Sequence, residues 1–343
     1  MNIILDGMGG DNAPDAIVEG ACLAAASMPE GSGITLVGKE KVLRDSLSKL
    51  KYHGDRISVV NADEIITNDD SPVRAIRRKK ESSIVKGIEM VKSGEGDAFV
   101  SAGSTGALLA GGLLILGKIP GVDRPSLATI YPVIGGEPSI ILDAGANAEC
   151  RAVNLREFGI MGSIYMEKVM KRKDPTVGLV NIGTEEHKGT TTTKEAYKLL
   201  KESNINFIGN IESRELQNSV CDVIVTDGFT GNALIKLTEG IGMMVLREMK
   251  KRFTADIKSK MGAVLLKDQL LALKKEFNYS EYGGAPILGV KGVVLKSHGS
   301  SDAMAISQTI LKAIPFVENR VVETIGKAVA DMAVQDSENA GEI

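Results

Sequence analysis

The sequence predicts an α/β fold in which helices cover both faces of a mostly parallel β-sheet. Short runs rich in β-branched residues alternate with longer segments of helical pattern, and this alternation is typical of parallel sheets. The chain has 343 residues, which is enough for one large domain or for two lobes. Glycine is abundant, with 38 residues, and many of these glycines directly follow the predicted strands.

Seven short apolar segments are predicted to be buried strands because they are continuous and rich in β-branched residues. They cover residues 3–5, 34–37, 57–60, 98–100, 139–142, 177–180 and 223–225. Long helical patterns follow at residues 13–27, 154–172, 190–202 and 232–252. We expect Asn12 to be the N-cap of the first helix, with Pro14 in its first turn.

We expect residues 1–336 to form one large α/β domain or two lobes that share a cleft, with a helical extension at about 230–280. Residues 337–343 are small and polar, and this tail is expected to fray. A formal charge of −3 lacks the basic excess of a general nucleic-acid binder. The three cysteines are too scattered for a disulfide framework or a zinc knuckle.

The first strand is preceded by no basic and apolar leader, and no run of about 18 apolar residues occurs anywhere. We therefore expect a cytoplasmic protein without a signal peptide or a membrane-spanning segment.

Six glycine-rich loops each follow a predicted strand and carry Asp, Asn, Ser or Thr beside glycine. They lie at residues 6–12, 101–106, 143–147, 181–189, 226–232 and 296–302. The carboxyl ends of parallel strands share one edge of a sheet, where backbone N–H groups and helix N-termini bind anions. A single loop of this kind is typical of a tight turn, but six together predict a polar, phosphate-binding cleft.

Two nucleotide-binding motifs are incomplete. The first loop has Asn12 where a dinucleotide fingerprint needs its third glycine, and Lys188 precedes Gly189 where a P-loop needs the reverse order. We therefore reject a nucleoside triphosphatase.

Six segments in a fixed order resemble the phosphate acyltransferases of bacterial phospholipid synthesis (the PlsX family) over nearly the whole chain. They are DGMGGDNAPDAIVEGA, VSAGSTGALLAGG, ILDAGAN, NIGTEEHKG, DVIVTDGFTGNALIK and YGGAPILGVKGVVLKSHGSSD. Two residues depart from the family pattern: Gly7 replaces a frequent alanine and Ser104 a frequent asparagine. Ser104 can still donate a hydrogen bond.

The resemblance implies a three-layer α/β/α fold similar to that of the isocitrate/isopropylmalate dehydrogenases and the phosphotransacetylases. It implies transfer of a long-chain acyl group from acyl-[acyl carrier protein] to inorganic phosphate, without a cofactor. The acyl phosphate would feed a downstream glycerol-3-phosphate acyltransferase. The resemblance also implies a homodimer that associates peripherally with the membrane.

This reaction needs little acid–base chemistry, since phosphate is a nucleophile at neutral pH and the thiol that leaves has a pKa of about 8.5. It needs phosphate held against the carbonyl and donors aimed at the oxyanion. The expected phosphate ligands are Ser101, Gly103, Ser104, Thr105, Gly106 and Asn147. The expected catalytic residues are His298, Lys188, Lys236 and Asn232.

Aspartates in these loops would repel phosphate, so we expect them to fix neighbouring Ser, Lys or backbone groups. They are Asp6, Asp11, Asp143 and Asp227. A divalent ion held by paired aspartates is the alternative, and we expect no metal. Cys150 as an acyl-enzyme nucleophile is the alternative to direct attack by phosphate.

A basic patch is the expected docking site for the acidic carrier protein, with a merely solvated face as the alternative. It consists of Arg74, Arg77, Arg78 and Lys79, with Lys80 beside them, and a second basic patch lies at Lys171, Arg172 and Lys173. Residues 250–275 carry eight basic and two acidic side chains, a local charge of 8 − 2 = +6.

A hairpin tip that inserts into an anionic membrane surface is predicted within this segment, between a helix ending near residue 253 and a second one beginning at 269. The tip consists of Met261, Val264, Leu265 and Leu266. Burial of the hairpin in the dimer is the alternative.

Three other functions remain open from the sequence. They are a phosphotransacetylase that uses a coenzyme A thioester, a metal- and nicotinamide-dependent dehydrogenase of the same fold, and a non-enzymatic scaffold at the membrane surface.

Overall fold

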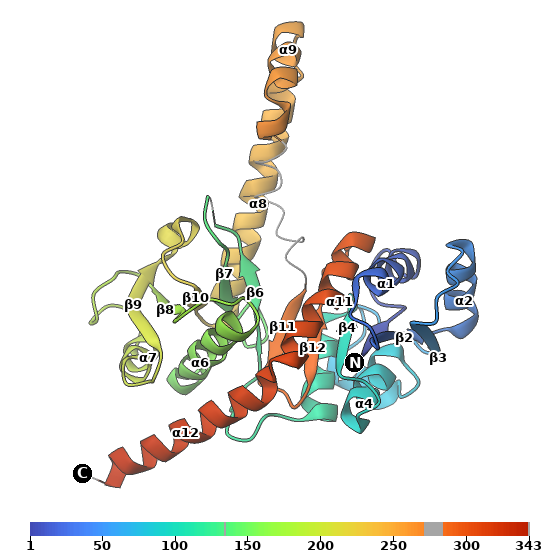
Figure 1. Cartoon of the computed structure of the whole chain (residues 1–343). Coiled ribbons are helices and arrows are strands. Elements are labelled where there is room, and N and C mark those ends of the chain that lie inside the picture. The colour runs from blue at the N-terminus through green and yellow to red at the C-terminus, as the bar shows by residue number, and fades with distance from the viewer. Residues whose placement is uncertain (134, 271–283, 342–343) are drawn as a thin grey trace.

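The computed structural model describes residues 1–133, 135–270 and 284–341. Its strands form two sheets that lie side by side (Figure 1), one of seven strands in the order β3-β2-β1-β4-β12-β11-β5 and one of five in the order β6-β7-β10-β8-β9. The first sheet contains β1 (Asn2–Asp6), β2 (Gly33–Gly38), β3 (Ile57–Asn61), β4 (Ala98–Ser101), β5 (Ser126–Leu127), β11 (Ala285–Leu288) and β12 (Val293–Lys296). The second contains β6 (Thr129–Tyr131), β7 (Ser139–Leu142), β8 (Thr176–Asn181), β9 (Asn206–Glu212) and β10 (Val223–Val225).

Parallel pairing dominates both sheets, as the sequence predicts. The antiparallel pairs described are β11 with β12, β11 with β5, and β6 with β7, so they gather where the two sheets face each other. All seven strands listed from the sequence are confirmed, and so is the strand expected before the loop at 296–302, which is β12. The prediction missed β5, β6, β9 and β11.

Helices flank both sheets. They are α1 (Asp15–Ser27), α2 (Glu40–Lys49), α3 (Pro72–Arg78), α4 (Ser83–Ser93), α5 (Thr105–Gly111), α6 (Ala152–Lys168), α7 (Thr191–Lys201), α8 (Gly228–Phe253), α9 (Ile257–Leu265), α11 (Ala303–Glu318) and α12 (Val321–Gly341). A π-helical stretch, η1 (Gly112–Leu116), continues α5, and a 3-10 turn, η2 (Ser213–Asn218), follows β9. The three-layer α/β/α class is therefore confirmed.

Residues on β1 show how the layers form. Ile3 and Leu5 pack with α1 and α11 on one face of the first sheet, whereas Ile4 packs with α4 and α5 on the other. This alternation follows from the two-residue repeat of a strand. Gly20 lets α1 approach α11 closely, since a Cβ there would lie 2.7 Å from the carbonyl oxygen of Ala303.

Several predicted boundaries were wrong. Pro14 stands at the N-cap of α1, and the Asn12 amide instead donates to the carbonyls of Ser300 and Ser301 at 3.1 and 3.2 Å. The helix α6 ends at residue 168 rather than 172. The helix α8 begins at residue 228 rather than 232 because Asp227 caps it. The helix α12 extends to residue 341, and the expected fraying of residues 337–343 stays a prediction.

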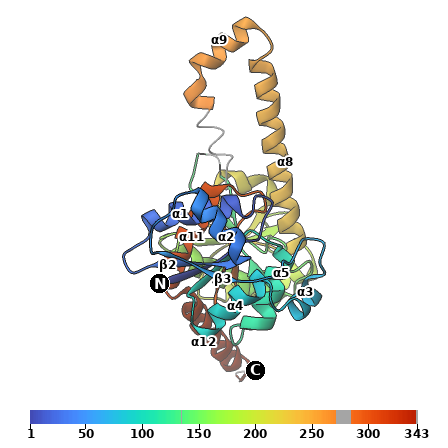
Figure 2. The same ribbon diagram turned by 90° about the vertical axis from the view of Figure 1, so that its right-hand side faces the viewer.

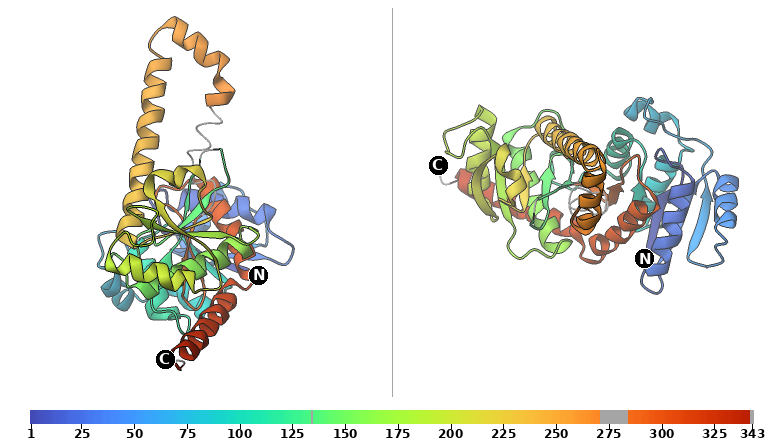
Figure 3. Two further views of the ribbon diagram at one scale, coloured as in Figure 1. Left: turned by 90° about the vertical axis from the view of Figure 1, so that its left-hand side faces the viewer. Right: turned by 90° about the horizontal axis from the view of Figure 1, so that it is seen from above.

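The helix α8 stands away from both sheets as a long arm, and α9 turns back from its far end (Figure 2). The 26 residues of α8 correspond to a length of about 39 Å. Figure 3 shows this arm and α12 on opposite sides of the molecule. Among the helices that the structure describes, none combines the length and the apolar character that crossing a membrane would require.

The second helix predicted from residue 269 falls mostly outside the described residues, as do Lys274 and Lys275. The apolar run at 261–266, expected to link the two helices, lies largely within α9.

Candidate functional site

Three adjacent parallel strands of the first sheet end in polar side chains. They are Asp6 on β1, Ser101 on β4 and Lys296 on β12. The β4–β12 register places Lys296 opposite Ser101, and β1 pairs with β4 up to Leu5 and Val100. The carboxylate, the hydroxyl and the ammonium therefore form a row along one edge of the sheet.

Hydrogen bonds fix the first two members of this row. The Ser101 hydroxyl donates to Asp6 Oδ2 at 2.6 Å and accepts the Gly103 N–H at 2.9 Å. The Met8 N–H donates to Asp6 Oδ1 at 3.1 Å. Burial raises the pKa of Asp6, although these donors oppose the increase.

The loops after β1, β4 and β12 form a continuous surface that we call the first rim (residues 6–12, 101–106 and 296–302). The Asp11 N–H donates to the carbonyl of Gly299 at 2.8 Å, and the Ser297 N–H to that of Ser101 at 2.9 Å. A Cβ at Gly9 would lie 2.7 Å from the Gly103 nitrogen. Only glycine permits this close approach of two loops.

Candidate anion donors lie where the first rim enters α5. Ser104 occupies the N-cap and is 9% exposed, but its hydroxyl makes no capping bond. Thr105 and Gly106 begin the helix, and the first N–H groups of a helix have no acceptor within it. His298 lies on the same rim, where its Nδ1 is 2.8 Å from the Ser300 hydroxyl, and its side chain is exposed.

Asp143, Asn147, Asp227 and Asn232 meet at the second sheet, in a surface that we call the second rim (residues 143–147 and 226–232). Asp143 Oδ2 accepts the N–H and the side-chain amide of Asn147, at 2.5 and 3.0 Å. That amide also donates to the carbonyl of Pro125 at 2.8 Å. Both amide protons of Asn147, which we expected to bind phosphate, thus hold the loop.

The N-terminus of α8 completes the second rim. Asp227 accepts the N–H and the hydroxyl of Thr230, at 2.8 and 2.9 Å, and the Gly228 N–H donates to the carbonyl of Asn147. Asn232 is exposed in the second turn and faces Gly145, whose φ of 125° suits glycine. Asp6, Asp143 and Asp227 thus bond to neighbouring groups, whereas Asp11 is exposed on the first rim.

A cleft of about 570 Å³ lies beside the second rim. It is bounded by the N-terminal ends of α7 and α8, and its lining includes Cys150, Thr190, Thr193, Phe229 and Thr230. Burial and the nearby Asp143 raise the pKa of the Cys150 thiol to about 11. The thiol is therefore protonated at neutral pH, which argues against Cys150 as a nucleophile.

The two predicted lysines lie further out. The carbonyl of Lys188 accepts from the Asn181 amide at 3.2 Å, and its side-chain stem lies beside Gly183. Lys236 is on the arm one turn beyond Asn232, where its ammonium is 3.3 Å from Glu239 and its side chain is 62% exposed. The structure thus groups Asn232 with Lys236, and His298 with the loop 101–106.

The predicted docking patch lies on α3, which packs against α5 through Pro72 and Gly106. Arg74, Arg77 and Arg78 are exposed. Lys79 differs from them, because its ammonium is 2.7 Å from Asp70 and also donates to the carbonyl of Ile65.

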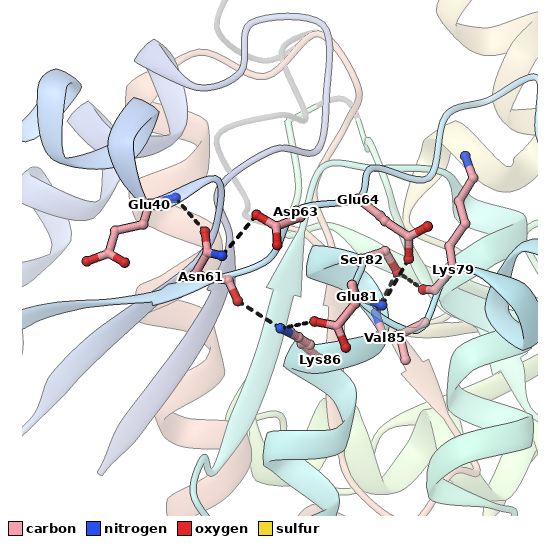
Figure 4. A network of polar contacts seen from close by, with 9 residues as sticks. All are labelled: Glu40, Asn61, Asp63, Glu64, Lys79, Glu81, Ser82, Val85 and Lys86. Atoms are coloured by element: carbon pink, nitrogen blue, oxygen red, sulfur yellow. Dashed lines mark hydrogen bonds and ion pairs between the residues drawn. The ribbon is translucent and has the colours of Figure 1, made fainter.

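Figure 4 shows the network that holds the end of this patch. The Ser82 hydroxyl donates to the carbonyl of Lys79 at 2.7 Å, and Glu64 accepts the Glu81 N–H at 3.0 Å. Lys79 is therefore part of the scaffold under the patch.

Within the described ranges, no three Asp, Glu, His or Cys side chains come together in a way that would hold a metal ion. Lys296 is the rim residue that the sequence analysis missed. Its position, directly after an apolar strand and before a glycine-rich loop, was the available signal.

Comparisons with known proteins identify relatives over nearly the whole chain. A family model described as "Fatty acid synthesis protein" matches residues 1–324. The chain is 51% identical to a phosphate acyltransferase of Alkaliphilus oremlandii, covering 98% of this chain and 100% of that one. It is 47% identical to a phosphate acyltransferase of Clostridium novyi, covering 95% and 97%.

Solved structures share the fold at low sequence identity. A phosphotransacetylase from Streptococcus pyogenes superposes with a TM-score of 0.60 at 17% identity, covering 94% of each chain. A branched-chain phosphotransacylase from Enterococcus faecalis gives 0.57 at 12% identity, covering 92% of this chain and 99% of that one. The predicted likeness to the phosphotransacetylase fold is confirmed.

Proposed function

The chain belongs to the phosphate acyltransferase family, and we propose that it transfers a long-chain acyl group from acyl-[acyl carrier protein] to inorganic phosphate. A phosphate oxygen attacks the thioester carbonyl, the carbon–sulfur bond breaks, and the carrier protein leaves as its thiolate. The other product, an acyl phosphate, then serves a downstream glycerol-3-phosphate acyltransferase in phospholipid synthesis.

The first rim carries the chemistry in this proposal. It brings the Ser104 and Thr105 side chains and the free N–H groups of a helix start to one sheet edge beside Ser101 and Gly103. Such donors suit a phosphate dianion, since hydrogen bonds to a charged group are stronger than neutral ones. No general base is required, because phosphate is already a nucleophile and a thiolate is a good leaving group.

The second rim and its neighbours supply the remaining groups. Asn232 is exposed and offers a neutral amide for the oxyanion, while Lys188 and Lys236 add positive charge nearby. His298 is exposed on the first rim, where an imidazole can donate to phosphate or to the departing sulfur.

The purified protein should form acyl phosphate from a long-chain acyl carrier protein and inorganic phosphate. Hydroxylamine trapping measures the product, and release of free carrier thiol should match it one for one. Acetyl-coenzyme A is the comparison donor, since phosphotransacetylases share this fold. Turnover of acetyl-coenzyme A but not of the carrier thioester would replace this proposal with the coenzyme A alternative.

Replacing Ser104 by Ala should raise the KM for phosphate about 10-fold and leave the KM for the acyl carrier nearly unchanged. The reason is the loss of one donor to a charged partner, which costs about 1.5–3 kcal/mol. Thr105→Ala should act in the same direction. Ser48→Ala is the control, because the Ser48 hydroxyl donates to Arg44 on the remote helix α2. An unchanged KM for phosphate in both site variants would show that phosphate does not bind at this loop.

We place carrier docking on α3 because its exposed arginines adjoin the helix that begins at the phosphate loop. Arg74, Arg77 and Arg78 point from one short helix, and the chain as a whole carries a net negative charge. A local basic patch is therefore needed to attract an acidic partner. Lys79 contributes mainly by holding the end of α3.

Charge reversal at Arg77 and Arg78 to Glu should raise the KM for the acyl carrier about 10-fold at low salt, with a smaller effect at high salt. The KM for phosphate should not change. The comparison reverses Lys171 and Lys173 of the second basic patch, which lie between α6 and β8. Equal losses in both double variants would show a general charge effect and reject α3 as the docking site.

The arm formed by α8 and α9 presents apolar side chains to solvent in the single chain. Leu237 is 61% exposed and Ile241 49%, and these residues lie one turn apart on α8. On α9 and just beyond it, Met261, Val264, Leu265 and Leu266 are 65%, 73%, 83% and 46% exposed. We assign the α8 face to contact with a second copy of the chain, and the α9 side chains, with lysines around them, to an anionic membrane surface.

Wild-type protein should float with anionic vesicles, and Val264→Glu combined with Leu265→Glu should abolish this binding, because acidic groups oppose insertion. Activity on the carrier substrate and the oligomeric state should persist. The control combines Val42→Glu with Leu50→Glu, two exposed apolar residues of the α2 region. Flotation of the α9 double variant, or absence of flotation in the wild type, would reject the arm as anchor.

A further inference from the structure

Lys296 is held between two loops of the first rim. It is the last residue of β12, and its side chain is partly buried. The ammonium donates to the carbonyl of Ala102 at 3.4 Å and to that of Ser297. Ala102 lies two residues before Ser104, so the ammonium sits inside the turn that leads to the candidate phosphate donors.

No carboxylate lies within 4 Å of the Lys296 ammonium in the part of the chain that the structure describes, but Asp6 and Asp11 lie near enough to favour its charged form. Two carbonyls occupy two of the three ammonium donors. A partly buried cation without a contacting carboxylate is costly, and an anion that binds beside it lowers this cost. A small anion that accepts the third ammonium donor therefore stabilises the charged lysine.

We propose that Lys296 is the charged ligand of the phosphate substrate and binds it from the side opposite Ser104 and Thr105. This inference rests on the proposed function and names the cation of its phosphate subsite. A lysine serves phosphate as a compact point charge, and hydroxyl and backbone donors complete the shell. Ser101 donates a hydrogen bond to Asp6 and stands opposite Lys296 in the strand register. Asp6 and Ser101 therefore help to hold Lys296 in position.

The surroundings of Lys296 predict a pH dependence. Burial lowers its pKa to about 8, while Asp11 and Asp6 act in the opposite direction. These two carboxylates come from β1 and its loop, whereas β4 and α5 carry no titratable side chain. The loop after β12 adds His298 and Asp302, of which Asp302 caps α11. The ammonium is charged below pH 8 and loses its proton above it, so phosphate binding should weaken as pH rises past 8.

The test compares wild type with Lys296→Met and Lys296→Arg. Lys296→Met should raise the KM for phosphate at least about 10-fold and leave the KM for the acyl carrier within about twofold. In the wild type the KM for phosphate should rise above pH 8. In Lys296→Arg this rise should be absent, because arginine stays charged. Lys312→Met is the control, since it removes a second lysine of lowered pKa, one that stands over the Tyr165 ring.

Binding is also measured without turnover, as the increase in melting temperature caused by inorganic phosphate. Wild type and Lys312→Met should be stabilised, and Lys296→Met should not. A KM for phosphate that is unchanged in Lys296→Met, while wild type makes acyl phosphate, would overturn this inference and leave the proposed function standing. Loss of the acyl-transfer reaction in the wild type would instead reject the function, and the melting experiment would still decide whether Lys296 binds phosphate. If Lys296→Met does not fold, Lys296→Arg decides the question. A KM for phosphate that still rises above pH 8 in Lys296→Arg would overturn the inference.

Discussion

A single buried carboxylate, that of Asp143, joins the two sheets. Asp143 is fully buried at the end of β7 in the second sheet, yet its Oδ1 accepts the Leu127 N–H from β5 of the first sheet at 3.0 Å. The same carboxylate accepts the N–H groups of Ala146 and Asn147 from its own loop. Burial raises its pKa, and these donors are what make a buried carboxylate tolerable. Asp143 therefore holds the edge strand β5 against the loop of the second rim, together with the bond from the Ala144 N–H to the carbonyl of Leu127 at 2.9 Å.

The division of roles among the polar residues follows from charge. Aspartates would repel a phosphate dianion, and three of them are turned toward N–H and hydroxyl donors of the scaffold. Asp6 holds Ser101, Asp143 holds the loop that contains Asn147, and Asp227 caps α8. Neutral and positive groups lie at the surface of the rims together with the exposed Asp11 and Asp302 of the first rim. The hydrogen bonds beneath the rims thus determine which charged groups face a substrate at this edge of the sheets.

Much of the fold was predictable because its central strands are short, apolar and bounded by glycine. The missed strands have physical reasons: β5 has two residues, and β11 contains Pro286, which fits a strand near an edge. One residue separates β5 from β6, so no linker revealed that the chain passes there from one sheet to the other. The rim loops were found from Gly beside Ser, Asn or Asp. The sequence did not reveal the partners of the Asn147 amide or the position of Lys296, because spacing does not show hydrogen-bond partners and a lysine is usually exposed.

The titratable groups of the rims also indicate what kind of catalysis the edge supports. The Cys150 thiol has a pKa near 11, and Asp6 and Asp143 are committed to donors of the scaffold, so none of the three is free to move a proton in each turnover. What remains, besides the exposed imidazole of His298, is a set of fixed donors and a lysine held by two carbonyls. Fixed donors act by orienting reactants and by meeting developing charge without reorganisation. Transfer from a thioester to phosphate is a reaction that such an edge can accelerate, since both the nucleophile and the leaving group are stable anions near neutral pH.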